Sequence, residues 1–189
     1  MTLRECFDRH KCDKGKRHGY EVVYEPIFEP VRNEPLRILE IGILRGESIA
    51  AWVDYFPNAE IVGIDTFGRV KPKDIPILNH SRVEWRRHDS TVPIDLGHFD
   101  FVIDDGLHIF PTQCMTFENF KPYADKYFIE DIWSFKHMTK LERQHRWLKN
   151  DGYTDKEYQE LLDAISPYDV KYHDLRKGYQ PDSFIYEVT

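Results

Sequence analysis

Carboxylates gather at the ends of two apolar stretches of the sequence, where buried strands are expected. Asp104 and Asp105 follow the residues FDFVI, and His108 stands three positions after Asp105. Glu130 and Asp131 follow the residues KYFI. If the two strands are parallel neighbours, these four carboxylates crowd one sheet edge and repel one another unless a cation lies between them. Oxygen ligands favour a hard ion, so we expect magnesium, with manganese or calcium as alternatives.

Such a group of residues suits the activation of an alcohol. An alcohol is a poor nucleophile because its pKa is close to that of water, about 15.7. A bound cation lowers the pKa of a ligated hydroxyl and fixes its direction. The imidazole of His108, with an ordinary pKa of about 6.5, could then accept the proton. His137, His145 and His173 have no comparable partners in the sequence and are assigned no role.

The residues from Arg37 to Asp65 predict a nucleotide-binding unit. They read as a strand, a glycine-containing turn, a helix and a second strand that ends on an acidic residue. In such units the helix N-terminus faces the cofactor and the carboxylate holds a ribose. The dinucleotide pattern G-x-G-x-x-G is incomplete, because Leu44 stands where a second glycine should follow Gly42. The chain therefore lacks the close backbone approach that a pyrophosphate needs, which disfavours a hydride-transferring oxidoreductase.

S-adenosylmethionine (SAM) fits this stretch better than a dinucleotide does. SAM has no pyrophosphate, and its cationic methionine end suits a carboxylate such as that of Glu40. Asp65 lies 23 residues after Gly42, where a ribose carboxylate is expected. We therefore expect SAM as the cofactor.

Alternating strand and helix patterns place these residues on one sheet. Apolar runs predict strands at 37–43, 60–67, 83–88, 99–104 and 126–132, with helices at 46–55 and 111–120. Further helices are expected at about 137–149 and from Thr154, which forms a capping box with Glu157. Two last strands, 169–175 and 183–188, are close enough for an antiparallel hairpin. The predicted fold is α/β, with a mostly parallel Rossmann-like sheet and an antiparallel C-terminal hairpin.

The sequence resembles the class I SAM-dependent methyltransferases. Glu40, Gly42 and Gly46 form the pattern E-x-G-x-x-x-G, which is similar to the first motif of these enzymes, and Gly63-Ile64-Asp65 is similar to the acidic second motif. The resemblance implies that the first motif lines the methionine and ribose, that Asp65 holds the ribose hydroxyls and that Asp89-Ser90 lies near the adenine. The residues expected to contact the cofactor are Tyr20, Glu40, Gly42, Gly46, Ser48, Asp65, Thr66, Asp89, Ser90 and Asp104.

Residues 12 to 135 also resemble a narrower family, the metal-dependent sugar O-methyltransferases of the macrocin and mycinamicin type. Those enzymes carry D-D-G-S-H after the fourth strand and a Glu-Asp pair after the fifth. They also carry a Lys/His/Tyr segment before the first motif, which Asp13-Lys14 and His18-Gly19-Tyr20 resemble. The resemblance implies that Asp105, Glu130 and Asp131 bind magnesium and that His108 is the base. Two departures are Leu107 in place of the serine and Glu47 in place of a common second glycine. Both weaken any transfer of substrate specificity.

Size and composition indicate one cytoplasmic domain. The chain has 189 residues, with 26 Lys and Arg against 33 Asp and Glu and a formal charge of -7. This balance disfavours nucleic acid or an anionic membrane as a partner. The apolar runs are too short to span a membrane, and the polar N-terminus is not a signal peptide. We expect a single methyltransferase domain over 1–189, with a helical or flap segment at 1–35 and the core at 36–189. Three cysteines are expected to be reduced thiols.

The sequence leaves several hypotheses open. The leading one is a SAM- and magnesium-dependent O-methyltransferase for a small-molecule hydroxyl, in particular of a carbohydrate, whose vicinal hydroxyls could chelate the metal. The alternatives are a catechol-type metal-dependent O-methyltransferase and a non-catalytic SAM-binding protein, which would not need the acids and His108. The basic segment 11–20 is either a solvated loop or a flap over the cofactor. We expect this segment, the 68–80 connection or a second subunit of a homo-oligomer to complete the pocket.

Overall fold

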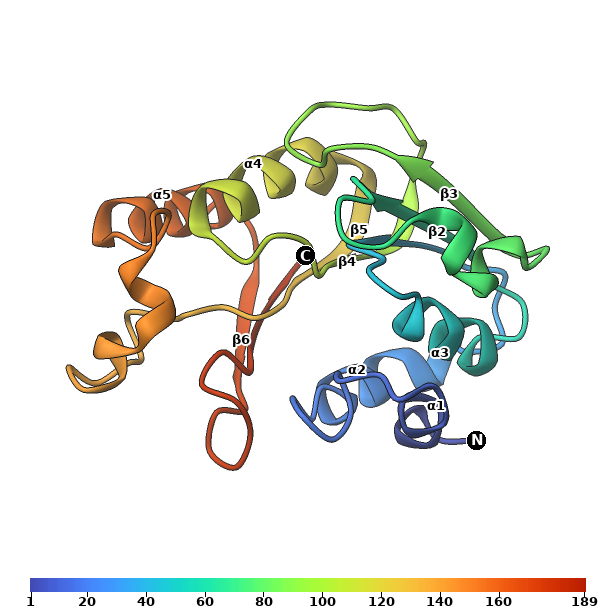
Figure 1. Cartoon of the computed structure of the whole chain (residues 1–189), viewed down its shortest axis with the longest axis horizontal. Helices are drawn as coiled ribbons and strands as arrows, with labels where there is room; N and C mark the ends of the chain where they lie inside the picture. The colour runs from blue at the N-terminus through green and yellow to red at the C-terminus, as the bar shows by residue number, and fades with distance from the viewer.

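A seven-stranded sheet forms the middle layer of the computed structural model, which describes residues 1–189 (Figure 1). The strand order is β3-β2-β1-β4-β5-β7-β6. The strands are β1 (Arg37–Ile41), β2 (Glu60–Asp65), β3 (Val83–Arg87), β4 (Phe99–Asp104), β5 (Ala124–Ile129), β6 (Val170–Asp174) and β7 (Phe184–Val188). The first five strands are parallel to one another, and β7 runs antiparallel to both β5 and β6. The predicted α/β class with an antiparallel C-terminal hairpin is confirmed.

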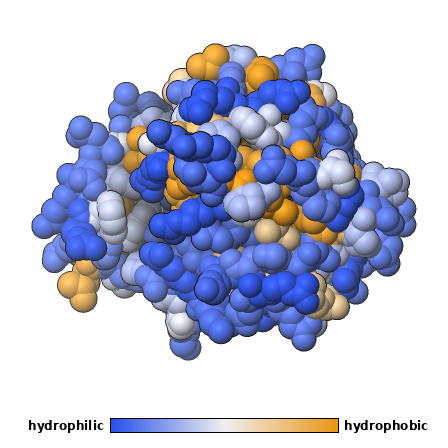
Figure 2. All heavy atoms as spheres, turned by 45° about the vertical axis from the view of Figure 1, so that its right-hand side comes forward, coloured by the Kyte–Doolittle hydropathy of each residue, from blue (hydrophilic) through white to orange (hydrophobic).

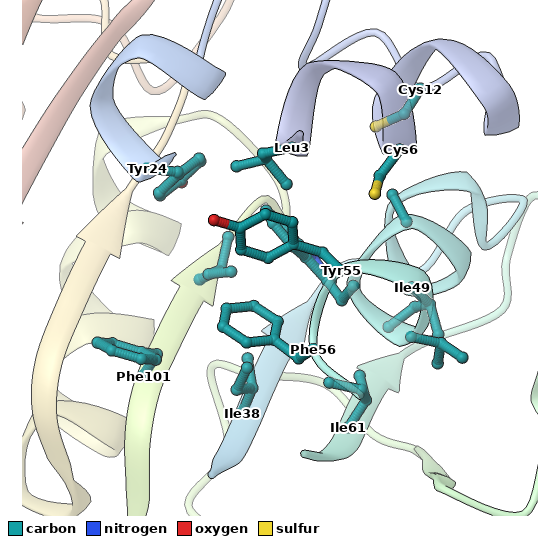
Figure 3. Close-up of a cluster of buried hydrophobic side chains, with 14 of the residues drawn as sticks. Leu3, Cys6, Cys12, Tyr24, Ile38, Ile49, Tyr55, Phe56, Ile61 and Phe101 are labelled. Carbon is teal, nitrogen blue, oxygen red and sulfur yellow. The ribbon is translucent and has the colours of Figure 1, made fainter. Parts of the chain in front are cut away.

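Helices cover both faces of the sheet. One face carries α1 (Leu3–His10), α2 (Glu21–Phe28) and α3 (Glu47–Tyr55), and the other carries α4 (Phe110–Phe120) and α5 (Asp155–Ile165). On the first face, Leu3 and Cys6 of α1 and Tyr24 of α2 lie in one buried cluster with Ile38 and Phe101 of the sheet (Figure 3). Their burial removes apolar surface from water and fixes the N-terminal helices on the sheet.

Local sequence signals explain where α1 and α5 begin. Thr2 caps α1 in a capping box with Glu5, and Thr154 caps α5 in the predicted box with Glu157. In each box the threonine side chain accepts from one orphan N–H and the glutamate accepts from another. The apolar stripe of α5 packs against the sheet, as the spacing of its residues predicts.

The predicted helix at 137–149 is wrong. The structure has only two short 3₁₀ turns there, Glu142–Gln144 and Arg146–Lys149. His145, between them, has an extended backbone with ψ of 139°, and its ring accepts from the N–H of Trp147. Few side chains of this segment are apolar, so no continuous stripe holds a helix on the core. The segment instead brings Trp147 to the cavity described below.

The outer surface matches the charged composition. Figure 2 shows a face on which hydrophilic side chains predominate and hydrophobic ones gather toward the middle. None of the helices combines the length and the apolar character needed to cross a membrane.

Candidate active site

A cavity of about 710 Å³ opens at the carboxyl ends of the parallel strands. This is the place where open α/β sheets bind ligands, and the volume is in the range of small-molecule sites. Residues after β1, β2, β3, β4 and β5 all contribute to its walls, together with the 12–20 loop and residues 68–70. The predicted site residues that line it are Tyr20, Gly42, Ser48, Asp65, Thr66, Asp89, Ser90, Asp105, His108, Glu130 and Asp131.

Gly42 lets the ends of β1 and β4 approach closely. Its φ is +94°, and a Cβ there would lie 2.0 Å from the carbonyl oxygen of Asp105. Any larger residue would therefore push the two strand ends apart. This close approach places the SAM-type motif beside the acidic cluster, which is why one cavity contains both.

Asp65 holds the loop that follows β1. One oxygen of its carboxylate accepts from the backbone N–H groups of Ile43 at 2.8 Å and Leu44 at 3.0 Å, and the other accepts from Phe67 N–H. Leu44 adopts a left-handed φ of 48°. Non-glycine residues rarely adopt this conformation, and it occurs often at functional sites. The predicted contact of Asp65 with a ribose stays a prediction.

Lys14 lies among the acids at the bottom of the cavity. Its side chain is 2% exposed, and its Nζ donates to Asp105 Oδ2 at 2.5 Å and to Glu130 Oε2. Tyr24 OH donates to the other oxygen of Glu130. Glu40 Oε1 lies 3.6 Å from the same Nζ. Lys14 belongs to the segment that resembles the Lys/His/Tyr segment of the sugar O-methyltransferases, but the sequence predicts no specific contact for it.

Asp131 and His108 form the outer part of the same cluster. His108 Nε2 lies 3.5 Å from Asp131 Oδ2 and 3.6 Å from Asp105 Oδ1. Tyr20 OH donates to Asp131 Oδ1, and His18 Nδ1 lies 3.4 Å from that oxygen. Asp131 has a φ of 53°, so its backbone is held in the left-handed region beside these partners. His18 and Tyr24, like Lys14, are members of this cluster that the predicted site omits.

The pKa values of His108 and Asp131 are both shifted in the direction that favours the charged form. Burial alone would raise the pKa of Asp131, but the neighbouring imidazoles, the hydrogen bond from Tyr20 and the Lys14 ammonium together outweigh burial and lower it. Burial alone would lower the pKa of His108, but Asp131 and Asp105 outweigh burial and raise it. Burial raises the pKa of Asp105 and of Glu130, against the opposing effect of the Lys14 ammonium. As predicted from the sequence, these acids are crowded together and are stabilised by a nearby positive charge.

The outer cluster has ligand atoms placed for a divalent cation. Atoms of Asp105, His108 and Asp131 all lie within 4.8 Å of one another. The two carboxylates supply oxygen ligands that suit magnesium or manganese, and the imidazole lies beside them. Glu130 is outside this group, because both of its oxygens accept hydrogen bonds from Lys14 and Tyr24. Each oxygen keeps a further lone pair, so the predicted role of Glu130 as a ligand stays a prediction.

Glu40 lies beneath the cavity and does not line it. Its side chain is fully buried, and Oε2 accepts from Trp52 Nε1 at 3.2 Å. Burial raises the pKa of Glu40 to about 7, while the Lys14 ammonium opposes the shift. Glu40 Oε1 is buried without a hydrogen-bond partner. In this structure Glu40 therefore faces Lys14, and its expected contact with the methionine end of SAM stays a prediction.

Asp104 and Gly46 also lie outside the cavity walls. Asp104 accepts from the backbone N–H of Gly106 at 3.3 Å and from Tyr127 OH at 3.2 Å. It thereby supports the turn that carries Asp105, and burial raises its pKa to about 7. Gly46 precedes α3 with a φ of 78°. Both residues hold the backbone turns that carry cavity-lining residues, and their direct contact with a cofactor stays a prediction.

Aromatic and apolar side chains line another part of the cavity. Trp147 is 53% exposed and Leu107 is 56% exposed, while Trp133 is buried and packs against the His145 ring at 4.7 Å. Tyr153 OH donates to the carbonyl oxygen of His108 at 2.8 Å, which fixes the turn that carries the imidazole. Exposed apolar surface within a cavity indicates a place for a ligand.

Comparisons with known proteins identify relatives of this chain. No protein-family model matches the sequence. Over 142 residues the chain is 34% identical to the 8-demethyl-8-(2-methoxy-alpha-L-rhamnosyl)-tetracenomycin-C 3'-O-methyltransferase of Streptomyces olivaceus, a match that covers 67% of this chain and 35% of that protein. Over 147 residues it is 29% identical to the mycinamicin VI 2''-O-methyltransferase of Micromonospora griseorubida, covering 70% of this chain and 36% of that protein. The chain thus spans about a third of the length of these curated relatives.

A solved methyltransferase structure has the same fold as this chain. The MycE methyltransferase of the mycinamycin biosynthetic pathway, solved with Mg and SAH, matches with a TM-score of 0.57 at 23% identity. The match covers 98% of this chain and 48% of that chain. Together with the strand order and the antiparallel β7, it confirms the resemblance predicted from the motifs. The chain therefore has the fold of the class I SAM-dependent methyltransferases and is related in sequence to sugar O-methyltransferases of the tetracenomycin and mycinamicin type.

Proposed function

We propose that this protein transfers a methyl group from SAM to a hydroxyl of a sugar or another polyol, with the help of a divalent cation. The observation that carries the proposal is the meeting of two predicted sites in one cavity. The SAM-type loop around Gly42 and the acids around Asp105 contribute to the same walls. The relatives are named for methyl transfer to glycosylated compounds, which supports a sugar hydroxyl as the acceptor.

The residues present fit SAM in the part of the cavity next to β1, β2 and β3. Gly42 leaves room at the loop, and Asp65, Thr66, Asp89 and Ser90 present polar groups to the cavity. When bound, SAM supplies an electrophilic methyl group, so that a C–O bond forms to the acceptor as the C–S bond breaks. This chain must therefore hold the acceptor oxygen in line with that bond and exclude water.

The acids and His108 would prepare the acceptor oxygen. Asp105 and Asp131, with Glu130 as the third predicted ligand, would hold the cation, which lowers the pKa of a ligated hydroxyl. His108 would take the hydroxyl proton at Nε2, the nitrogen that faces these acids. The turn carrying His108 is held by Tyr153, so the imidazole is positioned before an acceptor binds.

The aromatic part of the cavity would receive the acceptor. A sugar ring presents C–H groups on its faces and hydroxyls at its rim, so it can lie against an exposed indole and still direct hydroxyls elsewhere. Trp147 and Leu107 offer such a surface in the cavity that also contains His108. Vicinal hydroxyls could both reach one cation, which suits a carbohydrate as it suits a catechol.

A turnover assay tests the proposed function. We expect the protein, with SAM and Mg²⁺, to form SAH and a methylated product from a deoxysugar glycoside with vicinal hydroxyls, and EDTA to stop the reaction. A catechol of similar size is the comparison acceptor, and calorimetry with SAM and NAD is the control for the cofactor. Methylation of the catechol alone would favour the catechol-type alternative. Micromolar binding of SAM without turnover of any diol would favour a binding protein, and binding of NAD alone would contradict the cofactor assignment.

A further inference from the structure

Lys14 is a buried ammonium in the middle of the acidic cluster. It comes from the loop between α1 and α2, and its ammonium lies between carboxylates from three strand ends. These are Glu40 in β1, Asp105 after β4 and Glu130 after β5. Removing three carboxylates and one ammonium from water is unfavourable unless each charge meets an opposite one. Lys14 is the only Lys or Arg side chain paired with these acids.

The two oxygens of Asp105 face different partners. Oδ2 accepts from Lys14 Nζ at 2.5 Å, whereas Oδ1 lies 3.6 Å from His108 Nε2 in the outer cluster. Asp105 thus lies between an inner position, filled by an ammonium, and an outer position where ligand atoms of Asp105, His108 and Asp131 converge. A hydrogen bond from a buried donor fixes the rotamer of the carboxylate, so Oδ1 is directed outward.

We propose that Lys14 is a built-in cation that occupies the place of a second metal ion and positions Asp105 for a single divalent cation in the outer position. The proposal rests on the metal-dependent function inferred above, and it adds a positioning residue from the N-terminal segment to that site. An ammonium cannot be removed by a chelator or exchanged for another ion. One positive charge therefore stays beside the inner acids whether or not the outer position is filled.

The N-terminal segment is built to hold Lys14 in this place. The Lys14 carbonyl oxygen accepts from Tyr20 N–H at 2.7 Å, and Tyr20 and Tyr24 donate to Asp131 and Glu130. One short segment thus contacts the acids after β5 at several points. A solvated loop does not describe Lys14, although Lys16 in the same loop is exposed, and the flap alternative stays a prediction.

The test replaces Lys14 by methionine and counts bound ions. Methionine retains most of the apolar stem but ends one atom short, so it vacates the ammonium position. We expect Lys14→Met to bind one Mn²⁺ more per chain than the wild type, measured by equilibrium dialysis and electron paramagnetic resonance. We also expect its melting temperature to fall in EDTA and to recover in Mn²⁺ far more than that of the wild type. Lys16→Met, the same change at an exposed lysine of the same loop, should show neither effect.

Equal ion counts and equal recovery in Mn²⁺ for Lys14→Met and the wild type would overturn the proposal. If Lys14→Met does not fold, a double variant with Glu40→Gln removes one of the unpaired carboxylates and is expected to fold in EDTA. A double variant as unstable as the single one would show that the unpaired carboxylates do not cause the loss, and would also overturn the proposal. These readouts do not use methyl transfer. An extra ion on Lys14→Met therefore supports the role of Lys14 even if no acceptor is turned over, which would count against the proposed function alone.

Discussion

Asp105→Asn is expected to lower metal-dependent turnover by at least about a hundredfold while SAM binding remains. Asp105 is the acid that the structure places in both the inner and the outer parts of the cluster. The amide keeps an oxygen that can accept from Lys14, but it removes the negative charge that a cation needs. Stabilisation of charge by a metal ion contributes several kcal/mol, and about 1.4 kcal/mol corresponds to a factor of ten in rate.

The effect is measured as kcat at saturating SAM over a range of Mg²⁺ concentrations, with SAM affinity from calorimetry. Asp125→Asn is the matched control, because Asp125 lies in β5 but its side chain is 67% exposed and pairs only with His98. Exposed pairs of this kind contribute less than about 1 kcal/mol, so this variant should behave as the wild type. Unchanged turnover of Asp105→Asn would remove Asp105 from the proposed cation site.

His108→Gln is expected to lower kcat by roughly a hundredfold to ten-thousandfold, the usual contribution of a general base. Glutamine is polar and of similar reach, but it cannot take a proton at neutral pH. Metal affinity should change much less than for Asp105→Asn, which separates the two roles within one cluster. His98→Gln, at an exposed histidine paired with Asp125, is the control. Full activity of His108→Gln across neutral pH would show that the base is elsewhere.

The pH profile of the wild type supplies a second measure of His108. Asp131 and Asp105 raise the pKa of His108 in the cation-free protein, so the imidazole is protonated up to a higher pH than the ordinary value of about 6.5. Protonated His108 cannot act as a base, so kcat/KM should fall as the pH falls through this raised pKa. A divalent cation offsets the charge of the two acids, and more Mg²⁺ should therefore move the acid limb to lower pH. The residual activity of His108→Gln should lack this limb.

Much of the fold follows from local patterns in the sequence. The five parallel strands and the final hairpin have apolar runs that fix their type, and their observed ends differ from the predicted ones by only a few residues. The capping box of Thr154 located the start of α5. The segment 137–149 could not be predicted in this way, because its short turns are set by single contacts, such as that of the His145 ring with Trp147 N–H, rather than by a periodic apolar stripe.

The site, like the fold, has features that sequence patterns predict and others that depend on tertiary packing. The strand ends are close together because parallel topology requires it, so the meeting of Asp105, His108 and Asp131 could be predicted from spacing alone. The burial of Lys14 could not, since its neighbours Lys11 and Lys16 have the same residue type and lie in water. The resemblance to the Lys/His/Tyr segment points to Lys14, but only the tertiary packing of the 11–20 loop against β4 and β5 shows that its ammonium reaches the acids.

The measurement that tests the central claim most directly is a crystal structure of the protein soaked with SAH and Mn²⁺, with anomalous data to locate the ion. We expect SAH along the loop after β1, with its ribose near Asp65, and one manganese peak bound by Asp105 and Asp131 next to His108. Lys14 should remain in the inner position. Manganese bound away from these acids, or SAH bound outside the cavity, would contradict the proposal that cofactor and cation share one active site.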